Sequence, residues 1–161
     1  MFVNYDEISE TAKVWVYPSS RKFYPNELGK IEEKIEEFLV GWKSDDDAFK
    51  ASYQFLYQRF IILVAEHDTT ALKVQDIDAS VAFIIGLQEE FDVVLLDKMN
   101  VCFKQGEFVQ YKELADFKKL LKNKAVTAKT IVFDNLISTK DDLENHWELP
   151  IEDSWYGRFL K

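Results

Sequence analysis

The spacing of hydrophobic and polar positions changes several times along the chain, and each change predicts a new element. Residues 11–17 (TAKVWVY) alternate with β-branched and aromatic residues on both faces, which is typical of an internal strand covered on each side. From Pro25 to Trp42, apolar residues instead recur every three or four positions, opposite a row of glutamates. Because proline suits the first turn of a helix, this stretch predicts an amphipathic helix.

Residues 49–66 return to an alternation of period two. The stretch is longer than the usual strand of about 3 to 10 residues, so we predict a hairpin that turns near Gln58 and Arg59. Its second arm covers residues 60–66. Neither turn residue is a glycine or an asparagine, the types that such turns favour.

A second helix and a second hairpin follow. Asp78 is a suitable N-cap for a helix that reaches about Phe91. Apolar residues then alternate in two short arms, 99–104 and 107–111, on either side of Gly106. A glycine between two such arms predicts a tight hairpin turn.

This order, β-α-β-β-α-β, predicts an α+β protein with a ferredoxin-like core, in which a four-stranded antiparallel sheet has both helices on one face. We expect a single domain over residues 1–161. Residues 1–111 should form the ferredoxin-like core and hairpin, and residues 112–161 should form a C-terminal α/β extension packed on it.

The extension should contain a helix at 112–123, a strand at 130–133 and a short helix. Thr139 begins a pattern that resembles a capping box and predicts the start of that short helix. In the tail, Trp155 and Phe159 stand four residues apart, so they would share a helix face. We expect this face to pack on the open side of the sheet.

Charge narrows the range of partners. Twenty Lys and Arg against 29 Asp and Glu give a formal net charge of −9, which repels nucleic acid and anionic lipid surfaces. The densest basic stretch, 112–124, has five lysines but no arginine, which indicates a solvated helix face. The apolar runs are shorter than the roughly 18 residues of a membrane span, and the N-terminus lacks a basic leader. We expect a cytoplasmic protein that binds no nucleic acid and does not insert into membranes.

The glycines and the cysteine exclude further classes. No two of the five glycines have the spacing of a Gly-rich phosphate loop, so nucleotide-binding P-loops and dinucleotide fingerprints are excluded. Cys102 is the only cysteine, so an intrachain disulfide is impossible. Its place between apolar neighbours in a predicted strand indicates a small buried hydrophobic residue.

Candidate catalytic and metal-binding groups are few. His67 and His146 lie in separate polar segments, and neither forms the spaced pair that nucleophilic or metal chemistry requires. Residues 44–47 are the densest acidic run, but they lack the alternation and the glycine of a calcium loop. Asp76 and Asp78 are explained by a helix N-terminus. We therefore expect no metal and no cofactor.

The polar loop after the first strand is the best candidate for a ligand site. Ser19, Ser20 and Arg21 supply hydroxyls and a guanidinium close to a predicted helix start, which are the components of an anion site. The side chains of Trp15 and Tyr17 could line the same opening. The alternative is an ordinary solvated loop, since no glycine lets the backbone wrap a phosphate.

Several segments together resemble a family of small bacterial proteins of uncharacterised role that often carry the label "ABC transporter ATPase". They are AKVWVY, FLVGW, IDASVAFI, LLDKMNVCFKQGE, DFKKL, TIVFDNL and DSWYGRFL. The resemblance covers nearly the whole chain and implies a stand-alone intracellular protein, with no catalytic residues to carry over. Where the family often has a cysteine, this chain has Gln75. The P-loop and the Leu-Ser-Gly-Gly signature of an ABC ATPase are missing, so we expect no ATPase activity.

Two functions remain open. The leading hypothesis is a non-catalytic binding or interaction module, because the sheet is rich in aromatic residues and no acid, base, nucleophile and metal set converges. The alternative is a small-molecule or anion-binding protein, or an enzyme, that uses the loop of Ser19, Ser20 and Arg21.

Overall fold

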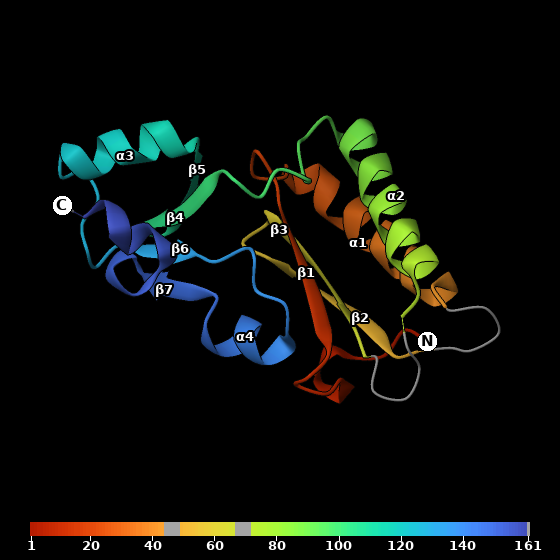
Figure 1. Ribbon diagram of the computed structural model, residues 1–161. Coiled ribbons are helices and arrows are strands. Elements are labelled where there is room, and N and C mark those ends of the chain that lie inside the picture. Colours follow the sequence, from red (N-terminus) through yellow and green to blue (C-terminus); the bar gives the residue numbers. More distant parts are fainter. Residues whose placement is uncertain (44–48, 67–71, 161) are drawn as a thin grey trace.

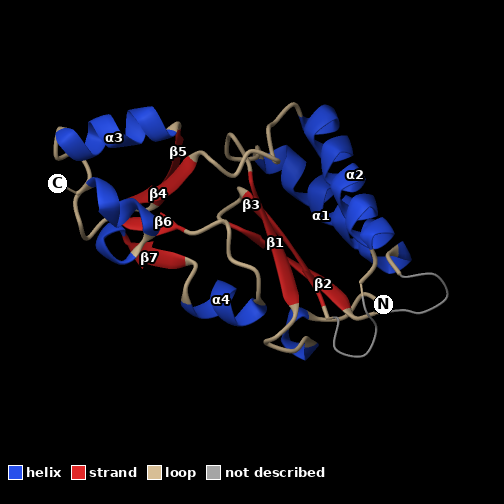
Figure 2. Ribbon diagram, viewed as in Figure 1, coloured by secondary structure: helices blue, strands red, loops and turns tan. Residues whose placement is uncertain are grey.

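The computed structural model describes residues 1–43, 49–66 and 72–160. It shows an α+β protein that contains two antiparallel sheets (Figure 1). Strands lie between the longer helices at the two outer sides of the molecule (Figure 2). Within these three stretches, no helix combines the length and the hydropathy that a membrane crossing requires.

The first sheet has three strands in the order β1-β3-β2. Their bounds are β1 (Lys13–Pro18), β2 (Ala51–Leu56) and β3 (Phe60–Ala65). The sequence FIILVA of β3 is buried throughout, as its central place requires. β1 is an edge strand, not the internal strand that its pattern predicts, but both of its faces are covered: Trp15 and Tyr17 face the helices, and Val14 and Val16 face the second sheet.

Two helices cover one face of this sheet, α1 (Pro25–Gly41) and α2 (Val74–Phe91). Buried side chains recur on α1 every four residues: Ile31, Ile35 and Leu39. α2 begins before the predicted cap, Asp78, because the carboxylate of Asp76 accepts the N–H of Lys73 at 2.8 Å and stabilises an earlier first turn.

The second sheet has four strands in the order β5-β4-β6-β7. Their bounds are β4 (Val101–Gln105), β5 (Phe108–Lys112), β6 (Ile131–Phe133) and β7 (Glu148–Pro150). The ferredoxin-like sheet is therefore not confirmed, because β4 pairs with β5 and β6 and not with β1. The edge of β1 is occupied instead by a later segment, where Val14 donates to the carbonyl of Ser138 at 3.0 Å and Lys140 donates to that of Ala12 at 2.9 Å.

The side chains of β4 explain why this strand leaves the first sheet. Val101 and Phe103 face away from the first sheet and pack with Phe117 of α3 (Leu114–Lys122), whereas Cys102 faces the first sheet. A strand with apolar residues on both faces requires cover on both sides. The first sheet covers one face of β4, and α3 covers the other. β4 and β5 therefore form a sheet with strands of the predicted C-terminal extension.

The C-terminal part ends in short helices. α4 (Lys140–Asn145) begins where the capping pattern predicts, because the hydroxyl of Thr139 accepts a backbone N–H of its first turn at 3.1 Å. The tail forms a 3-10 helix at Trp155–Phe159. The prediction that Trp155 docks is wrong, since 51% of this residue is exposed. Tyr156 docks instead, with its ring 5.5 Å from that of Phe117, because the tight 3-10 turn points the two neighbouring rings in different directions.

Candidate functional site

The polar loop after β1 is held by contacts within the protein. The guanidinium of Arg21 donates to both carboxylate oxygens of Glu27, at 2.9 and 3.2 Å, and to the carbonyl of Phe91 at 2.7 Å. The hydrogen bond from Arg21 lowers the pKa of Glu27. Arg21 thus joins the start of α1 to the end of α2.

The two serines of this loop also serve structural contacts. The hydroxyl of Ser20 accepts the backbone N–H of Val94 at 2.9 Å. Ser19 is fully buried, and its hydroxyl accepts the backbone N–H of Arg21 at 3.4 Å. Each of the three polar residues that the sequence suggests for an anion site therefore has at least one contact within the protein.

Trp15 and Tyr17 pack in the apolar cluster between the first sheet and its two helices. Trp15 packs edge-on against Trp42, with ring centroids 6.1 Å apart. Tyr17 is buried, and the ammonium of Lys98 lies 5.0 Å from its ring centroid. The five predicted residues therefore all make contacts within the protein. None of the five lines the cavity described next.

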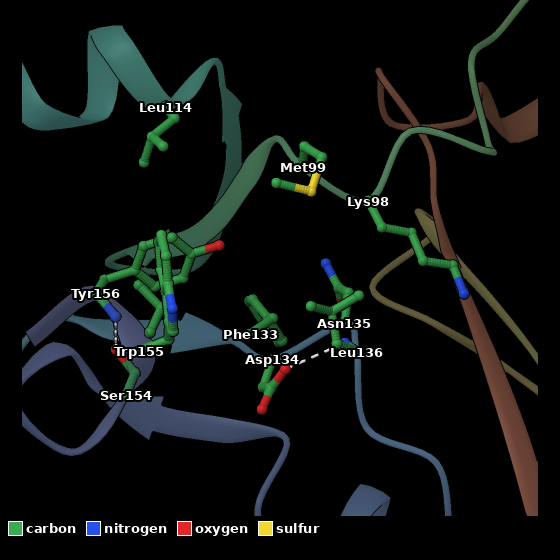
Figure 3. A pocket seen from close by; sticks show the side chains of 11 residues that line it. Lys98, Met99, Leu114, Phe133, Asp134, Asn135, Leu136, Ser154, Trp155 and Tyr156 are labelled. Carbon is green, nitrogen blue, oxygen red and sulfur yellow. Dashed lines mark hydrogen bonds between the residues drawn. The ribbon is translucent and has the colours of Figure 1, made fainter.

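A cavity of about 390 Å³ lies where β6 and the residues after it meet the C-terminal tail (Figure 3). Pockets for small groups typically measure about 300 to 1,000 Å³. Its lining is mostly apolar and consists of Lys98, Met99, Leu114, Val132, Phe133, Asp134, Asn135, Leu136, Ser154, Trp155 and Tyr156. Four separate segments of the chain contribute, so only folding creates this site.

Exposed apolar side chains surround the opening. Met99 is 70% exposed, Leu136 is 69% exposed and Trp155 is 51% exposed. Figure 3 shows Trp155 on one side of the cavity, with Met99 and Leu136 on the other. Scattered exposed hydrophobic residues are ordinary, but a group of them around a cavity marks an interaction site.

Asn135 and Tyr156 at the cavity differ in whether their side chains already form hydrogen bonds within the protein. Asn135 is buried, and its side-chain oxygen already accepts the indole N–H of Trp147 at 3.0 Å. Burial raises the pKa of Tyr156 to about 12, so its hydroxyl remains a donor at neutral pH. Among the residues that the structure describes, no hydrogen bond occupies this hydroxyl.

The lining of the cavity contains one carboxylate, Asp134, and one lysine, Lys98, and the guanidinium of Arg158 lies 4.2 Å from the ring centroid of Trp155. The carboxylate of Asp134 accepts the N–H of Leu136 at 3.1 Å, and over the described ranges it forms no ion pair. Lys98, the one cation in the lining, directs its ammonium toward Tyr17 and away from the cavity (Figure 3). Burial lowers the pKa of Lys98. A positively charged group beside an apolar one could therefore pair with the carboxylate of Asp134.

Cys102 and His146, two further candidates from the sequence, do not line this cavity. Cys102 is fully buried, as predicted, and burial raises the pKa of its thiol to about 12. His146 is exposed, with Nδ1 3.4 Å from a carboxylate oxygen of Asp142, and Asp141 adds a third possible ligand atom within 4.8 Å. Sequence spacing did not suggest this group, and all three side chains are at least partly exposed, two on a helix of six residues and His146 directly after it. His67 and the acidic residues 44–47 lie outside the described residues.

The sequence analysis missed the cavity altogether. Two of its lining residues, Val132 and Phe133, belong to a predicted strand, but the others come from loops, the start of α3 and the tail. One signal was present: Leu136 follows Asp134 and Asn135 directly, so an apolar residue stands in a polar turn that an ordinary loop would leave hydrophilic.

The chain matches no family model, no curated protein and no solved structure.

Proposed function

We propose that this protein is a non-catalytic binding module whose cavity beside β6 receives an apolar side chain of a partner protein, next to basic residues of that partner. The observation that carries the proposal is the ring of exposed Met99, Leu136 and Trp155 around a cavity of about 390 Å³. Burying such rims and filling the pocket with one anchor residue is the usual source of affinity at protein interfaces.

Charge supports a basic partner. Asp134 lines the cavity, and Asp97, Glu113 and Asp153 directly precede three other lining residues. All four carboxylates are exposed, and no ion pair within the described ranges neutralises them. The net charge of −9 adds long-range attraction for a cationic segment.

The hydroxyl of Tyr156 supports a peptide in particular. A protonated phenol at the cavity wall can donate to a backbone carbonyl, which every peptide supplies beside its anchor residue. Such a donor fixes the direction of a bound segment, while the apolar walls supply most of the affinity.

The lining favours binding over catalysis. It contains no histidine or cysteine. Besides Tyr156, Ser154 is the one lining residue that carries a hydroxyl. The Ser154 hydroxyl donates to the carbonyl of Ile151 at 2.8 Å and accepts the N–H of Tyr156 at 3.1 Å. A serine engaged in this way, with no base beside it, is not an activated nucleophile.

Selection from a displayed library of random peptides tests the proposal directly. We expect the selected peptides to share one large apolar residue flanked by Lys or Arg, and to change the fluorescence of Trp155. Leu136→Asp should weaken binding of the best peptide by about tenfold or more, because it places a charge on the apolar rim. The matched control is Val74→Asp, since Val74 is 71% exposed at the start of α2, far along the chain from the cavity.

Equal binding by wild type and Leu136→Asp would contradict the proposed site. Selection of acidic peptides, or of peptides without an apolar anchor, would contradict the proposed partner chemistry. Titration at increasing salt separates the two contributions, because screening weakens the contacts of the basic flank and leaves the apolar anchor.

A further inference from the structure

A second cleft, of about 400 Å³, lies between the β2–β3 turn and the β4–β5 turn. Its charged lining residues are Lys22, Arg59 and Glu107, and its apolar walls include Phe55, Phe108 and Val109. Two cations against one carboxylate make this cleft positive, on a protein whose net charge is −9. The cleft shares no lining residue with the cavity beside β6.

Arg59 is the unusual member of this cleft. It is half-buried, and burial lowers the pKa of its guanidinium. The only hydrogen bond from its side chain to a described residue is long, 3.5 Å from Nη1 to the carbonyl of Ser19, although a guanidinium carries five N–H donors. No ion pair from the described part of the chain reaches it.

Arg21 is an arginine of the same protein whose guanidinium has several hydrogen-bond acceptors. It binds Glu27 through two hydrogen bonds and Phe91 through a third. A half-buried guanidinium normally obtains such a partner, because an unpaired charge is costly away from water. Arg59 is half-buried too, but no carboxylate of a described residue pairs with it.

The fold brings Lys22 to the same place. The N–H of Phe23 donates to the carbonyl of Gln58 at 2.9 Å, and the N–H of Ser19 donates to that of Arg59 at 3.0 Å. These two bonds tie the loop after β1 to the β2–β3 turn, with Lys22 between them. The exposed ammonium of Lys22 has no ion pair among the residues described.

An apolar surface stands beside these cations. Phe108, next to the turn at Gly106, is 67% exposed and lines the cleft together with Phe55. An aromatic ring and a guanidinium that line the same cleft can bind a ligand that has both a flat apolar part and an anionic group.

We propose that this cleft binds a small organic anion, a carboxylate or phosphate attached to an apolar ring, through Arg59 and Lys22 with the ring against Phe108. Both oxyanions match the forked donors of a guanidinium, so the shared chemistry is a planar or tetrahedral set of oxygens that accepts two parallel hydrogen bonds. Glu107 opposes the anion and limits its charge.

Titration by ¹⁵N–¹H NMR with phenyl phosphate and phenylacetate tests the proposal. We expect either ligand, or both, to shift the backbone resonances of Arg59 and Phe108 saturably, and the stronger of the two identifies the oxyanion. Benzyl alcohol and benzylamine should not produce these shifts. Inorganic phosphate should bind more weakly than phenyl phosphate, because it lacks the ring.

Three variants connect the binding to named side chains. Arg59→Gln should weaken binding by about tenfold, and Lys22→Gln, at an exposed position that folding tolerates, by about threefold. Glu107→Gln should strengthen binding, which a merely apolar cleft would not show. Arg158→Gln, an exposed arginine in the tail, is the matched control and should leave binding unchanged.

The proposal is overturned if neither anion shifts these resonances, or if benzyl alcohol binds as well as phenylacetate. It is also overturned if Lys22→Gln and Glu107→Gln both leave the affinity unchanged. Because the peptide-binding experiments use the other cavity, either proposal can fail while the other stands.

Discussion

The hydroxyl of Tyr57 donates a hydrogen bond of 2.7 Å to the carboxylate of Glu148, a residue 91 positions away in the sequence. The ring of Tyr57 also packs against Phe133 and Trp147, with centroids 5.4 and 6.2 Å away. One side chain at the β2–β3 turn thereby attaches the first sheet to the second. Burial and the hydrogen bond to Glu148 raise the pKa of this tyrosine, so the contact persists at neutral pH.

The backbone of this turn is strained. Tyr57 and Gln58 both adopt left-handed conformations, with φ of 57° and 54°, and neither is a glycine. Since Gln58 is exposed, Gln58→Gly should raise the free energy of unfolding by about 1 kcal/mol. Tyr57→Gly should lower it by about 2 kcal/mol, because the lost ring contacts outweigh the relieved strain.

Urea unfolding followed by tryptophan fluorescence measures both changes. Gly106→Ala provides the reciprocal control, since Gly106 has a φ of 61° and alanine there should destabilise the protein. A Gln58→Gly protein no more stable than wild type would show that the turn carries no recoverable strain.

The two neighbouring aromatics of the tail should differ in their contribution to stability. Tyr156→Ala should lower the free energy of unfolding by about 2 to 3 kcal/mol, because its ring packs on Phe117. Trp155→Ala should change it by less than about 1 kcal/mol, because this ring is half exposed. Thermal melting of the two variants distinguishes them, and a larger loss for Trp155→Ala would mean that the tail docks in the way the sequence pattern predicted.

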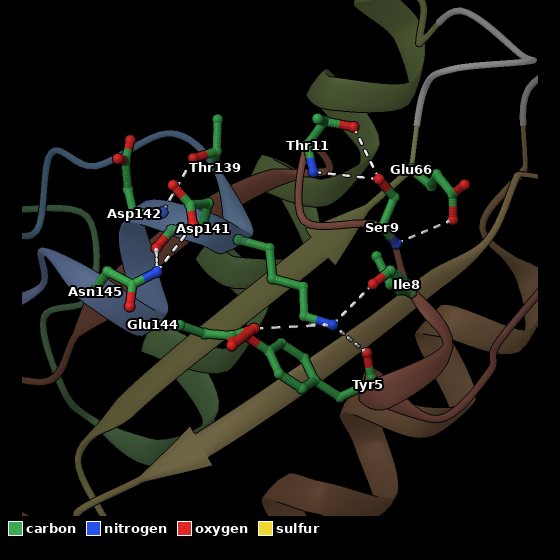
Figure 4. Close-up of polar contacts among 11 residues, drawn as sticks. Tyr5, Ile8, Ser9, Thr11, Glu66, Thr139, Asp141, Asp142, Glu144 and Asn145 are labelled. Atoms are coloured by element: carbon green, nitrogen blue, oxygen red, sulfur yellow. Dashed lines mark hydrogen bonds and ion pairs between the residues drawn. The ribbon is translucent and has the colours of Figure 1, made fainter.

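Lys140 anchors α4 to the N-terminal segment. Its buried ammonium donates to the carbonyls of Tyr5 and Ile8, at 2.9 and 2.7 Å, and lies 3.9 Å from the carboxylate of Glu144 (Figure 4). Lys140→Met should lower the free energy of unfolding by about 2 to 3 kcal/mol, since a buried carbonyl and a partly buried one lose a charged donor. The exposed Lys122→Met should change it by less than about 0.5 kcal/mol, and equal effects in urea unfolding would contradict this role for Lys140.

The thiol of Cys102 should be inert in the folded protein. Its pKa of about 12 lies above the ordinary value of roughly 8.5, so at mildly alkaline pH it stays protonated when folded and ionises when unfolded. This group therefore makes the protein less stable as the pH rises above roughly 8.5. Iodoacetamide should leave Cys102 unmodified in native protein and modify it fully in guanidinium, as mass spectrometry can show. Rapid modification of native protein would mean that the two sheets separate readily.

The label "ABC transporter ATPase" would imply ATP hydrolysis, and the sequence predicts that this activity is absent. Phosphoryl transfer in P-loop enzymes requires a backbone cradle, a lysine and a hydroxyl that holds Mg²⁺, and the five glycines of this chain do not form that cradle. We expect no magnesium-dependent ATP hydrolysis above background in a coupled assay. Turnover that persists through further purification and disappears in Arg21→Ala would contradict this prediction.

Local chemistry in the sequence determined the elements whose ends depend on neighbouring residues. Pro25 starts α1, Gly106 turns the β4–β5 hairpin, and Thr139 caps α4, because a proline ring, a glycine φ or a hydroxyl acts within a few residues. The same locality explains the correct expectation that Cys102 is buried in a strand.

Tertiary structure alone decided which sheet β4 joins and where the binding surfaces lie. An apolar pattern on both faces of β4 requires two covers but does not say which elements provide them. Arg21 and Arg59 look equivalent in the sequence, yet one meets Glu27 and the other meets no carboxylate among the described residues. Cavities and unpaired charges depend on contacts between distant segments, and a sequence pattern carries only the preferences of each segment for burial.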